Sequence, residues 1–180
     1  MVYIFLADGF EEMEAMAPID ILRRGGVKVT TVGVGGRQIT GSHGVPFVAD
    51  CQLGEVDLSD GQMLLLPGGL PGADNLRDSE LVCAALLQAY ERGAYIGAIC
   101  AAPYVLGQLG LLKGRRATCY PGFEDRLLGA QATGEAVVVD GNIITAKGPG
   151  VADQFGFQLL SSLMGEACSS QVRKEMQWQR

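Results

Sequence analysis

The chain has 180 residues, of which 48% are hydrophobic and 19% are charged, and its formal net charge at pH 7 is -6. That length suffices for one well-filled hydrophobic core and is short for two, so residues 1–180 are expected to form a single domain. The acidic balance, without a basic stripe, argues against a nucleic-acid partner. The first apolar run, residues 2–7, is too short for a signal peptide or a membrane span, so no membrane partner is expected.

Cysteine usage bears on the cellular compartment and on metal binding. The sequence contains five cysteines, an odd number without CxxC spacing, and a single histidine, His43. This pattern predicts neither a disulfide framework nor a zinc site, and it favours a reducing, cytoplasmic location. The glycine run at 33–36 does not fit the GxGxxG spacing of dinucleotide-binding loops. We therefore expect no metal and no cofactor.

Short apolar runs rich in β-branched residues alternate with longer segments of helical periodicity. In chain order the pattern predicts a strand at 2–7, a helix at 10–24, a strand at 28–32, a hairpin at the sheet edge at 37–48 and a strand at 63–66. It then predicts a helix at 78–92 that Asp78 caps, a strand that leads directly into a helix at 94–106, a second hairpin at 137–145 and a last helix at 150–164. Such alternation is typical of an α/β protein whose mostly parallel sheet carries helices on both faces.

Cys100 lies between the apolar run 94–99 and the predicted helix that follows it. The first N–H groups of a helix have no intrahelical partner and carry partial positive charge, so they favour a thiolate over a thiol. This position predicts a lowered thiol pKa and a nucleophilic or redox-active cysteine. The alternative is a small apolar side chain buried at the end of a strand, since cysteine is among the most buried residue types.

Glu14 falls within the apolar arc of the first predicted helix, between Ile21 and Pro18. A carboxyl group on a core-facing surface must be paired or keep its proton, because desolvation disfavours its charged form. Glu14 is therefore a candidate proton donor. Glu11 and Glu12 are interpreted instead as a solvated cluster that the helix dipole stabilises.

The glycine-rich turn at 67–72 follows a fully apolar strand and allows backbone N–H groups to approach a ligand. A tight turn without any role in binding is an equal alternative. Because ligands bind outside the carboxyl ends of strands in open α/β sheets, we expect this turn, Cys100 and Glu14 at one sheet edge. A thiolate beside a carboxylate is repelled, so the predicted arrangement is an ionised Cys100 next to a protonated Glu14.

With these residues the chain resembles the ThiJ/PfpI superfamily, most closely the branch that contains the parkinsonism-associated protein deglycase. Four segments carry the resemblance: Glu11-Glu12-Met13-Glu14, Leu66-Pro67-Gly68-Gly69, Ala98-Ile99-Cys100-Ala101-Ala102-Pro103 and Gly148-Pro149-Gly150. The resemblance implies a flavodoxin-like three-layer sandwich, usually a homodimer. It also implies that Cys100 is the nucleophile, that Glu14 is the acid beside it, and that the N–H groups of Gly69 and Ala101 form an oxyanion site.

One departure from the family pattern concerns histidine. Many members of the superfamily have a histidine near the cysteine where this chain has Tyr120. His43 lies in the first hairpin, with no sequence reason to reach the thiol within one subunit. A Cys-His protease is therefore disfavoured, and Glu14 is left as the acid–base group. Tyr120 is interpreted as an auxiliary hydrogen-bond donor or, alternatively, a core tyrosine, and its neighbour Cys119 as a weak candidate for a resolving thiol.

The resemblance implies glutathione-independent glyoxalase chemistry, deglycation of early glyoxal adducts, and oxidative-stress sensing with chaperone-like behaviour. We expect an enzyme whose partner is a small carbonyl compound, an α-oxoaldehyde such as methylglyoxal or its early glycation adduct, attacked by Cys100. The alternative is a redox-sensing or chaperone-like protein in which Cys100 is oxidised to the sulfinate without turnover. A plain interaction scaffold is the third hypothesis.

Overall fold

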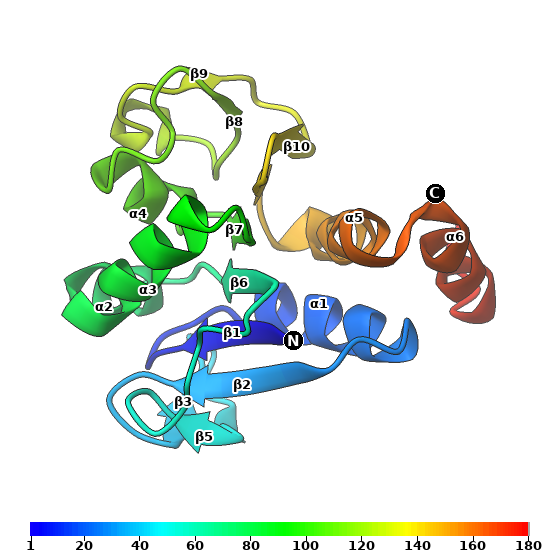
Figure 1. Cartoon of the computed structure of the whole chain (residues 1–180), viewed down its shortest axis with the longest axis horizontal. Helices are drawn as coiled ribbons and strands as arrows, with labels where there is room; N and C mark the ends of the chain where they lie inside the picture. The colour runs from blue at the N-terminus through cyan, green and yellow to red at the C-terminus, as the bar shows by residue number, and fades with distance from the viewer. Residues whose placement is uncertain (180) are drawn as a thin grey trace.

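A central sheet organises the molecule (Figure 1). A computed structural model describes residues 1–179, and within them seven strands form this sheet in the order β10-β11-β7-β6-β1-β2-β5. All neighbouring strands are parallel except β10 and β11, which form the second predicted hairpin. In chain order the strands of this sheet are β1 (Val2–Leu6), β2 (Val29–Gly33), β5 (Cys51–Gln52), β6 (Met63–Leu66), β7 (Tyr95–Ile99), β10 (Val137–Asp140) and β11 (Ile143–Ala146).

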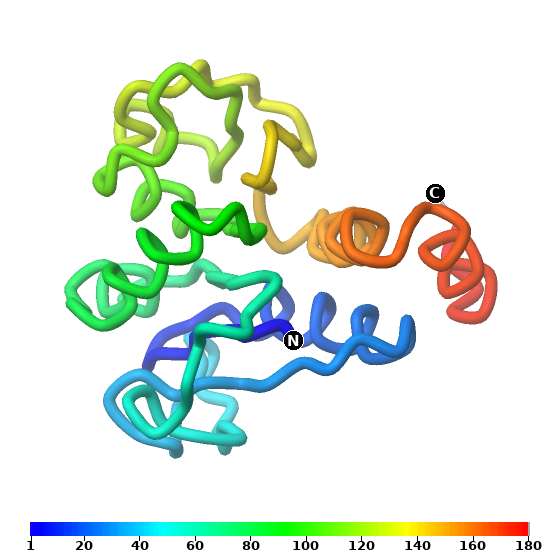
Figure 2. Tube along the Cα trace, viewed as in Figure 1, coloured from blue at the N-terminus to red at the C-terminus, as the bar shows by residue number. Residues whose placement is uncertain are grey.

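Helices cover the two faces of the sheet. One face carries α1 (Glu12–Arg24) and α5 (Ala152–Met164), with α6 (Glu166–Glu175) packed against α5 on its outer side (Figures 1 and 2). The opposite face carries α2 (Gly72–Asp78), α3 (Glu80–Glu91) and α4 (Pro103–Gln108). The predicted α/β class is thus confirmed, as is the flavodoxin-like three-layer sandwich.

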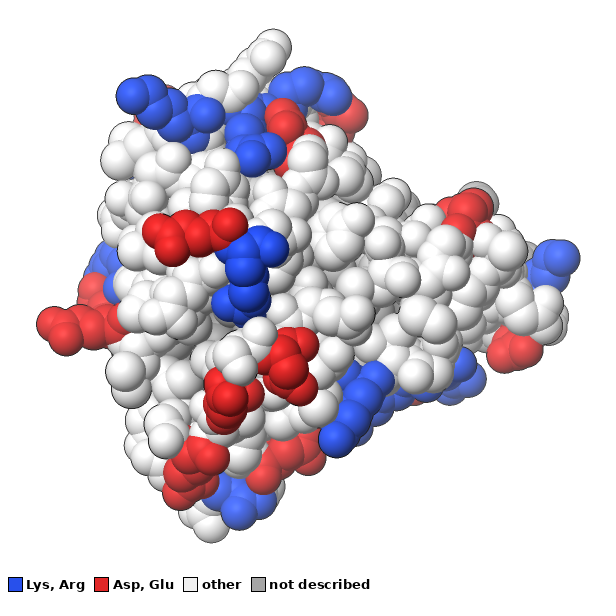
Figure 3. Space-filling view, in the orientation of Figure 1, with Lys and Arg blue, Asp and Glu red and all other residues white. Residues whose placement is uncertain are grey.

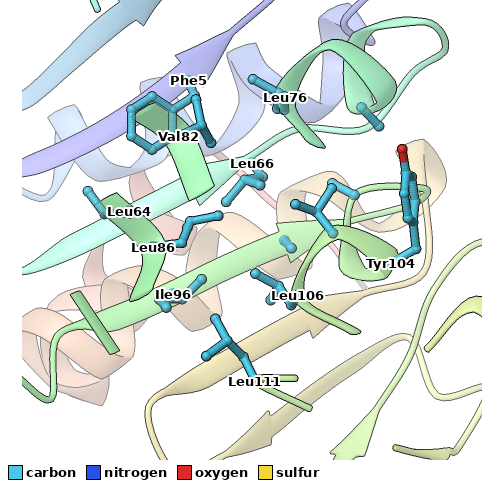
Figure 4. Packing of buried hydrophobic residues seen from close by; sticks show 14 of the residues in the cluster. Phe5, Leu64, Leu66, Leu76, Val82, Leu86, Ile96, Tyr104, Leu106 and Leu111 are labelled. Atoms are coloured by element: carbon cyan, nitrogen blue, oxygen red, sulfur yellow. The ribbon is translucent and has the colours of Figure 1, made fainter. Parts of the chain in front are cut away.

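Strand β6 shows how the sequence builds two cores on one sheet. Its residues Met63-Leu64-Leu65-Leu66 are all buried, because the strand is central and helices cover both of its faces. Successive side chains point to opposite faces, so Leu64 and Leu66 enter the cluster beneath α2, α3 and α4 (Figure 4). Met63 and Leu65 join the cluster beneath α1 and α5 on the other face.

The helix predicted over residues 78–92 is α3, which begins at Glu80, and the preceding helix α2 was not predicted. Asp78 ends α2, and the residue that caps α3 is Ser79, whose hydroxyl accepts a hydrogen bond from the backbone N–H of Val82 at 3.4 Å. The prediction of Asp78 as the cap is therefore wrong by one residue. Ser and Asp are both good N-caps, and only the path of the chain decides between adjacent candidates.

The first predicted hairpin forms a small sheet of its own from β3 (Gln38–Thr40) and β4 (Pro46–Val48), and does not extend the edge of the main sheet. Its Thr40 carbonyl accepts from Gly9 N–H at 2.8 Å, and the Asp8 carboxylate accepts from Thr40 N–H at 2.8 Å. The hairpin is thereby fixed to the loop between β1 and α1. The sequence pattern did not predict β8 (Arg116–Ala117) or β9 (Gln131–Ala132), which pair in parallel, nor the 3-10 turns η1 (Glu124–Arg126) and η2 (Pro149–Val151).

Surface charge agrees with the acidic composition. On the face that Figure 3 shows, Lys and Arg side chains are scattered among Asp and Glu side chains and do not gather into a stripe. Among residues 1–179, none of the helices has both the length and the apolar run that crossing a lipid bilayer requires.

Candidate active site

The carboxyl ends of β1, β6 and β7 bring three sequence segments together. The loop after β1 leads into α1, the turn at 67–72 follows β6, and Cys100 directly follows β7. Glu11 N–H donates to the Gly68 carbonyl at 2.9 Å, which ties the start of α1 to the glycine turn. The sheet thus places Glu14, Gly68 and Cys100 side by side, at the edge where the sequence predicted a site.

Cys100 occupies a strained turn between β7 and α4. Its φ is 63°, in the left-handed region that a residue with a side chain rarely adopts and that costs on the order of 1–3 kcal/mol. Hydrogen bonds on both sides hold it there: its N–H donates to the Ala146 carbonyl at 2.9 Å, and its carbonyl accepts from Tyr120 N–H at 2.8 Å. The half-buried side chain is therefore presented in one direction, as is the nucleophile at the strand-to-helix turn of α/β-hydrolases.

Glu14 is the carboxyl group beside this thiol. Its side chain lies on the buried face of α1, where only 1% of the residue is exposed. Oε2 accepts a hydrogen bond from Gly68 N–H at 2.9 Å, while Oε1 has no hydrogen-bond partner among residues 1–179. The Cys100 side chain lies beside this carboxyl group across Gly68, and each of the two groups shifts the pKa of the other.

Gly68 makes this approach sterically possible. A Cβ atom built at residue 68 would lie 2.6 Å from Glu14 Oε2 and 2.7 Å from Cys100 Cβ, far inside normal contact distance. Only a hydrogen atom fits between the Glu14 carboxyl group and the Cβ atom of Cys100. The sequence pattern predicted only a glycine-rich turn here, whereas the contact between the carboxyl group and the cysteine requires glycine at this position.

The two groups share one electrostatic environment. The pKa of Glu14 is raised to about 7, mainly by burial and less by the charge of Glu11, while Cys100 and the hydrogen bond from Gly68 N–H oppose the change. Burial and the Glu14 charge also raise the pKa of the Cys100 thiol, against the opposing effect of the Ala101 and Gly69 amides. The sequence predicted a lowered thiol pKa from the helix start alone; the net direction is the reverse, because burial and the adjacent carboxyl group outweigh the amides.

The backbone amides of Ala101 and Gly69 lower the pKa of the Cys100 thiol, against the larger effects of burial and Glu14. Gly69 has a φ of 83°, and a Cβ at this position would lie 2.5 Å from Glu11 N and Gly9 O. Glycine adopts this conformation without strain, and only glycine fits the crowded turn that follows β6. Two donors converging on one point are suited to hold negative charge, first on sulfur and then on an oxygen bound to it.

Glu11 and Glu12 have separate tasks and are not a solvated cluster. Glu11 is the N-cap of α1, and its carboxylate accepts from Glu14 N–H at 2.8 Å. Glu12 Oε2 lies 2.8 Å from His43 Nδ1. The pKa of Glu12 is lowered to about 2, because the hydrogen bonds from His43 outweigh the opposing effect of burial. Glu12 in turn raises the pKa of His43. The hairpin thus brings the histidine to the start of the helix that carries Glu14.

The donor atoms of Glu11, Glu12 and His43 lie within 4.8 Å of one another, close enough to ligate a metal ion. Carboxylate oxygens and an imidazole nitrogen suit several divalent metals. Glu12 and His43 already satisfy each other by a direct hydrogen bond, so this group also has a structural explanation. The expectation of no bound metal stays a prediction.

A pocket of about 220 Å³ opens above the thiol. Its lining residues are Gly69, Leu70, Cys100, Ala101, Tyr120 and Phe123. Tyr120 is 47% exposed, so the interpretation of this residue as a core tyrosine is wrong. Cys119, by contrast, is buried, and burial raises the pKa of its thiol to about 11, which makes it a poor resolving thiol.

Comparison with known proteins agrees with this geometry. The model of the DJ-1/PfpI family matches residues 1–162 of this chain. The chain belongs to that family. It is 37% identical over 174 residues to Protein dj-1beta of Drosophila melanogaster, and the matched region covers 95% of this chain and 93% of that protein. It is 30% identical over 168 residues to the Glutathione-independent glyoxalase DJR-1.2 of Caenorhabditis elegans, covering 92% of this chain and 89% of that protein.

The fold comparison leads to the same DJ-1/PfpI family. The structure of oxidized Toxoplasma gondii DJ-1 superposes with a TM-score of 0.95 and 32% sequence identity, covering 99% of this chain and 98% of that one. The predicted resemblance to the ThiJ/PfpI superfamily is therefore confirmed in both sequence and fold.

Within this DJ-1/PfpI site, sequence reasoning missed the roles of three residues. Gly68 was part of a turn pattern, but its contact with two side chains has no sequence signal. His43 was separated from the site by its place in the hairpin, although it lies against Glu12 at the start of the helix that carries Glu14. Phe123 follows Tyr120 by three residues in the segment after α4. This aromatic pair was the sequence signal that could have indicated a role for Phe123.

Proposed function

We propose that this protein is a cysteine-dependent enzyme that converts a small 2-oxoaldehyde into the corresponding 2-hydroxy acid without glutathione. One observation carries the proposal: a buried carboxyl group with a pKa raised to about 7 lies beside the Cys100 thiol, where the backbone amides of Gly69 and Ala101 favour negative charge on sulfur. An acid–base group is most effective when its pKa lies near the working pH. The glyoxalase name of the Caenorhabditis elegans relative supports this chemistry.

The first step is addition of the thiol to the aldehyde. The Glu14 carboxylate accepts the thiol proton while Sγ forms a bond to the aldehyde carbon, so a resting thiolate is not required. The carbonyl π electrons move to oxygen, and the amides of Gly69 and Ala101 stabilise the resulting alkoxide. Glu14 then returns the proton to this oxygen, which gives a neutral hemithioacetal and a carboxylate ready for the next step.

The second step moves a proton between carbons. Glu14 removes the proton from the former aldehyde carbon, and the electron pair left behind forms an enediolate with its charge on the ketone oxygen. The hemithioacetal hydroxyl proton passes to that oxygen, and Glu14 delivers its own proton to the ketone carbon, so the first carbon is oxidised to a thioester and the second is reduced to an alcohol. Water then adds to the thioester, the C–S bond breaks, and the thiol regains its proton. The sum is one oxoaldehyde and one water giving one hydroxy acid, with no external oxidant or reductant.

Lactate formation from methylglyoxal tests the proposal. We expect purified protein to release lactate with no glutathione present, and the Cys100→Ala variant to lose this activity, because the carbon–sulfur bond cannot form. Lactate is measured by an enzymatic assay or by NMR. Equal lactate release by Cys100→Ala and the parent protein would show that the cysteine is not the nucleophile.

The alternative is redox sensing at the same cysteine. The solved Toxoplasma gondii relative is named as oxidized, and a protonated Glu14 could donate a hydrogen bond to a sulfinate. In contrast, the raised pKa of the Cys100 thiol disfavours rapid oxidation, which needs the thiolate. In the same experiment, no lactate together with selective oxygen addition at Cys100 after peroxide, seen by intact mass, would replace the glyoxalase proposal by the redox one.

Early glycation adducts are the second substrate class that we propose for this site. In such an adduct the former aldehyde carbon carries a hydroxyl group and the amine or thiol of the modified molecule. Glu14 protonates the leaving amine or thiol while the hydroxyl loses its proton, which restores the aldehyde carbon that Cys100 attacks. Leu70 and Tyr120 at the pocket mouth are half exposed, which leaves room for a larger substrate. The lactate assay with preformed adduct as the carbon source distinguishes direct action on the adduct from consumption of free methylglyoxal.

We also propose that residues 1–180 form one domain that works as a homodimer in the cytoplasm. Large apolar side chains are exposed on α1 and the first hairpin: Met13 at 60%, Val45 at 54% and Val48 at 64%. Apolar side chains close together on a surface are typical of an interface. Light scattering should give twice the 19.0 kDa mass of the chain, and a monomer mass that persists at micromolar concentration would contradict the dimer.

A further inference from the structure

The pocket above Cys100 has an apolar outer wall. Leu70, Tyr120 and Phe123 line it, together with the backbone of Gly69 and Ala101, and none of the lining residues carries a charged side chain. Its volume is about 220 Å³, whereas a single water molecule needs about 10–15 Å³ of such space. Methylglyoxal offers this wall only a methyl group, so the pocket is larger and more apolar than that substrate requires.

Tyr120 is held in place beside the thiol. Its backbone N–H donates to the Cys100 carbonyl at 2.8 Å, so the position of the residue follows that of the cysteine. Its ring rests on Gly148, where a Cβ atom would lie 3.2 Å from Tyr120 Cδ2. The Gly148-Pro149-Gly150 motif thus has a local task, because its first glycine leaves room for the tyrosine ring.

Phe123 is held from behind by a second set of contacts. The guanidinium carbon of Arg126 lies 5.2 Å from the centre of the Phe123 ring and 4.1 Å from that of the Tyr104 ring. Tyr104 is itself fully buried at the edge of the core, and its hydroxyl points away from the apolar cluster (Figure 4) and donates to the Asp74 carboxylate. Cation–π stacking on a buried ring restrains Arg126 and, through it, Phe123.

From this geometry we propose that Tyr120 and Phe123, with Leu70, form a specificity pocket that selects 2-oxoaldehydes with an aromatic substituent over those with a methyl or a charged one. An aromatic ring on the ketone carbon can stack against the two aromatic side chains. A charged substituent would lose water there without gaining a partner. Tyr120 thus determines specificity and takes no part in proton transfer.

This inference rests on the proposed function and leaves its chemistry unchanged. Phenylglyoxal and one water give mandelate, with the aldehyde carbon oxidised and the ketone carbon reduced by the steps given above. Cys100 and Glu14 act on the same two carbons, and only the substituent on the ketone carbon meets the aromatic wall.

A thiol-protection experiment tests the pocket independently of turnover. The rate of Cys100 alkylation by iodoacetamide is measured at increasing mandelate and at increasing lactate, two product-like ligands that differ only in the ring. We expect mandelate to halve the rate at a concentration about tenfold or more below that of lactate, since added apolar groups in a fitted pocket give discrimination of that size. Tyr120→Ala should reduce this ratio to about threefold, whereas Tyr120→Phe should retain it.

Matched controls separate an effect of the pocket wall from a general effect on the protein. Leu87→Ala removes an exposed apolar side chain from α3, far in sequence from the pocket lining, and should leave the ratio unchanged. Circular dichroism checks that Tyr120→Ala is folded. Equal protection by mandelate and lactate overturns the proposal. So does a Tyr120→Ala variant whose ratio of half-protecting lactate to mandelate concentrations is unaltered, or in which only the oligomeric state changes. Failure of lactate release from methylglyoxal would instead concern the proposed function.

Turnover gives the second measurement. For an active enzyme, kcat/KM for phenylglyoxal should exceed that for methylglyoxal by about tenfold or more, and the ratio should fall in Tyr120→Ala. Mandelate release is the readout, because it does not respond to any reaction of phenylglyoxal with arginine side chains. A ratio of one or less in the parent protein contradicts an aromatic preference.

Discussion

Replacement of Glu14 by glutamine is expected to lower kcat/KM for methylglyoxal by about 10²–10⁴, the usual contribution of a positioned acid–base group. Glutamine keeps the size of the side chain and can keep the hydrogen bond from Gly68 N–H, but it cannot accept the thiol proton or carry it between the two carbons. The measurement is lactate release by Glu14→Gln and the parent protein, both at pH 7.

The same substitution should make the thiol more acidic. Burial and the Glu14 charge raise the pKa of Cys100, so removing that charge lowers the pKa toward that of an ordinary thiol. Alkylation by iodoacetamide at pH 8 should therefore be faster in Glu14→Gln while turnover is slower. These opposite changes indicate a proton-transfer role, because general damage to the site would not raise the alkylation rate while lowering turnover.

Glu12→Gln is the matched control for these two measurements. Glu12 lies in the same first turn of α1, but its carboxylate is bonded to His43 and not to the thiol. We expect it to leave the alkylation rate of Cys100 close to that of the parent protein. A Glu14→Gln variant with a parental alkylation profile and parental turnover would show that the carboxyl group and the thiol are not coupled.

The second large effect concerns stability and pH. The Glu14 pKa is about 7 in the folded protein against a reference value of 4.5, so between these values the folded state holds a proton that the unfolded state has released. The contribution of this group to stability is therefore fully present below pH 4.5 and is lost as the pH rises through 7. The difference amounts to about 3 kcal/mol, given 1.36 kcal/mol for each pKa unit.

Urea denaturation at pH 5 and pH 8 measures this effect. Other groups also titrate in this range. The change in unfolding free energy between pH 5 and pH 8 is therefore determined for the parent and for Glu14→Gln, and the two changes are compared. The parent should lose up to about 3 kcal/mol more than the variant on going from pH 5 to pH 8. An identical loss in both proteins would mean that the Glu14 pKa is not raised in the folded state.

The sequence by itself determined the layered fold and singled out Cys100 and Glu14, which the structure places side by side. Apolar runs such as 63–66 predict buried parallel strands because such strands are covered on both faces, and helical periodicity marks Glu14 as a carboxyl group on a buried surface. The position of Cys100 directly after β7 follows from the same pattern. These features are local, so spacing along the chain is enough to reveal them.

Other features depend on packing between distant segments, and only the tertiary structure decided them. The sequence placed Cys100 at a helix start and predicted a lowered pKa, but burial and Glu14 reverse that direction. The task of Gly68 and the contact of His43 with Glu12 arise where the loops after separate strands meet. The helix α6 has few apolar residues and is defined by its packing on α5. A pKa or a steric fit depends on every atom within a few ångströms, and chain spacing does not determine which atoms those are.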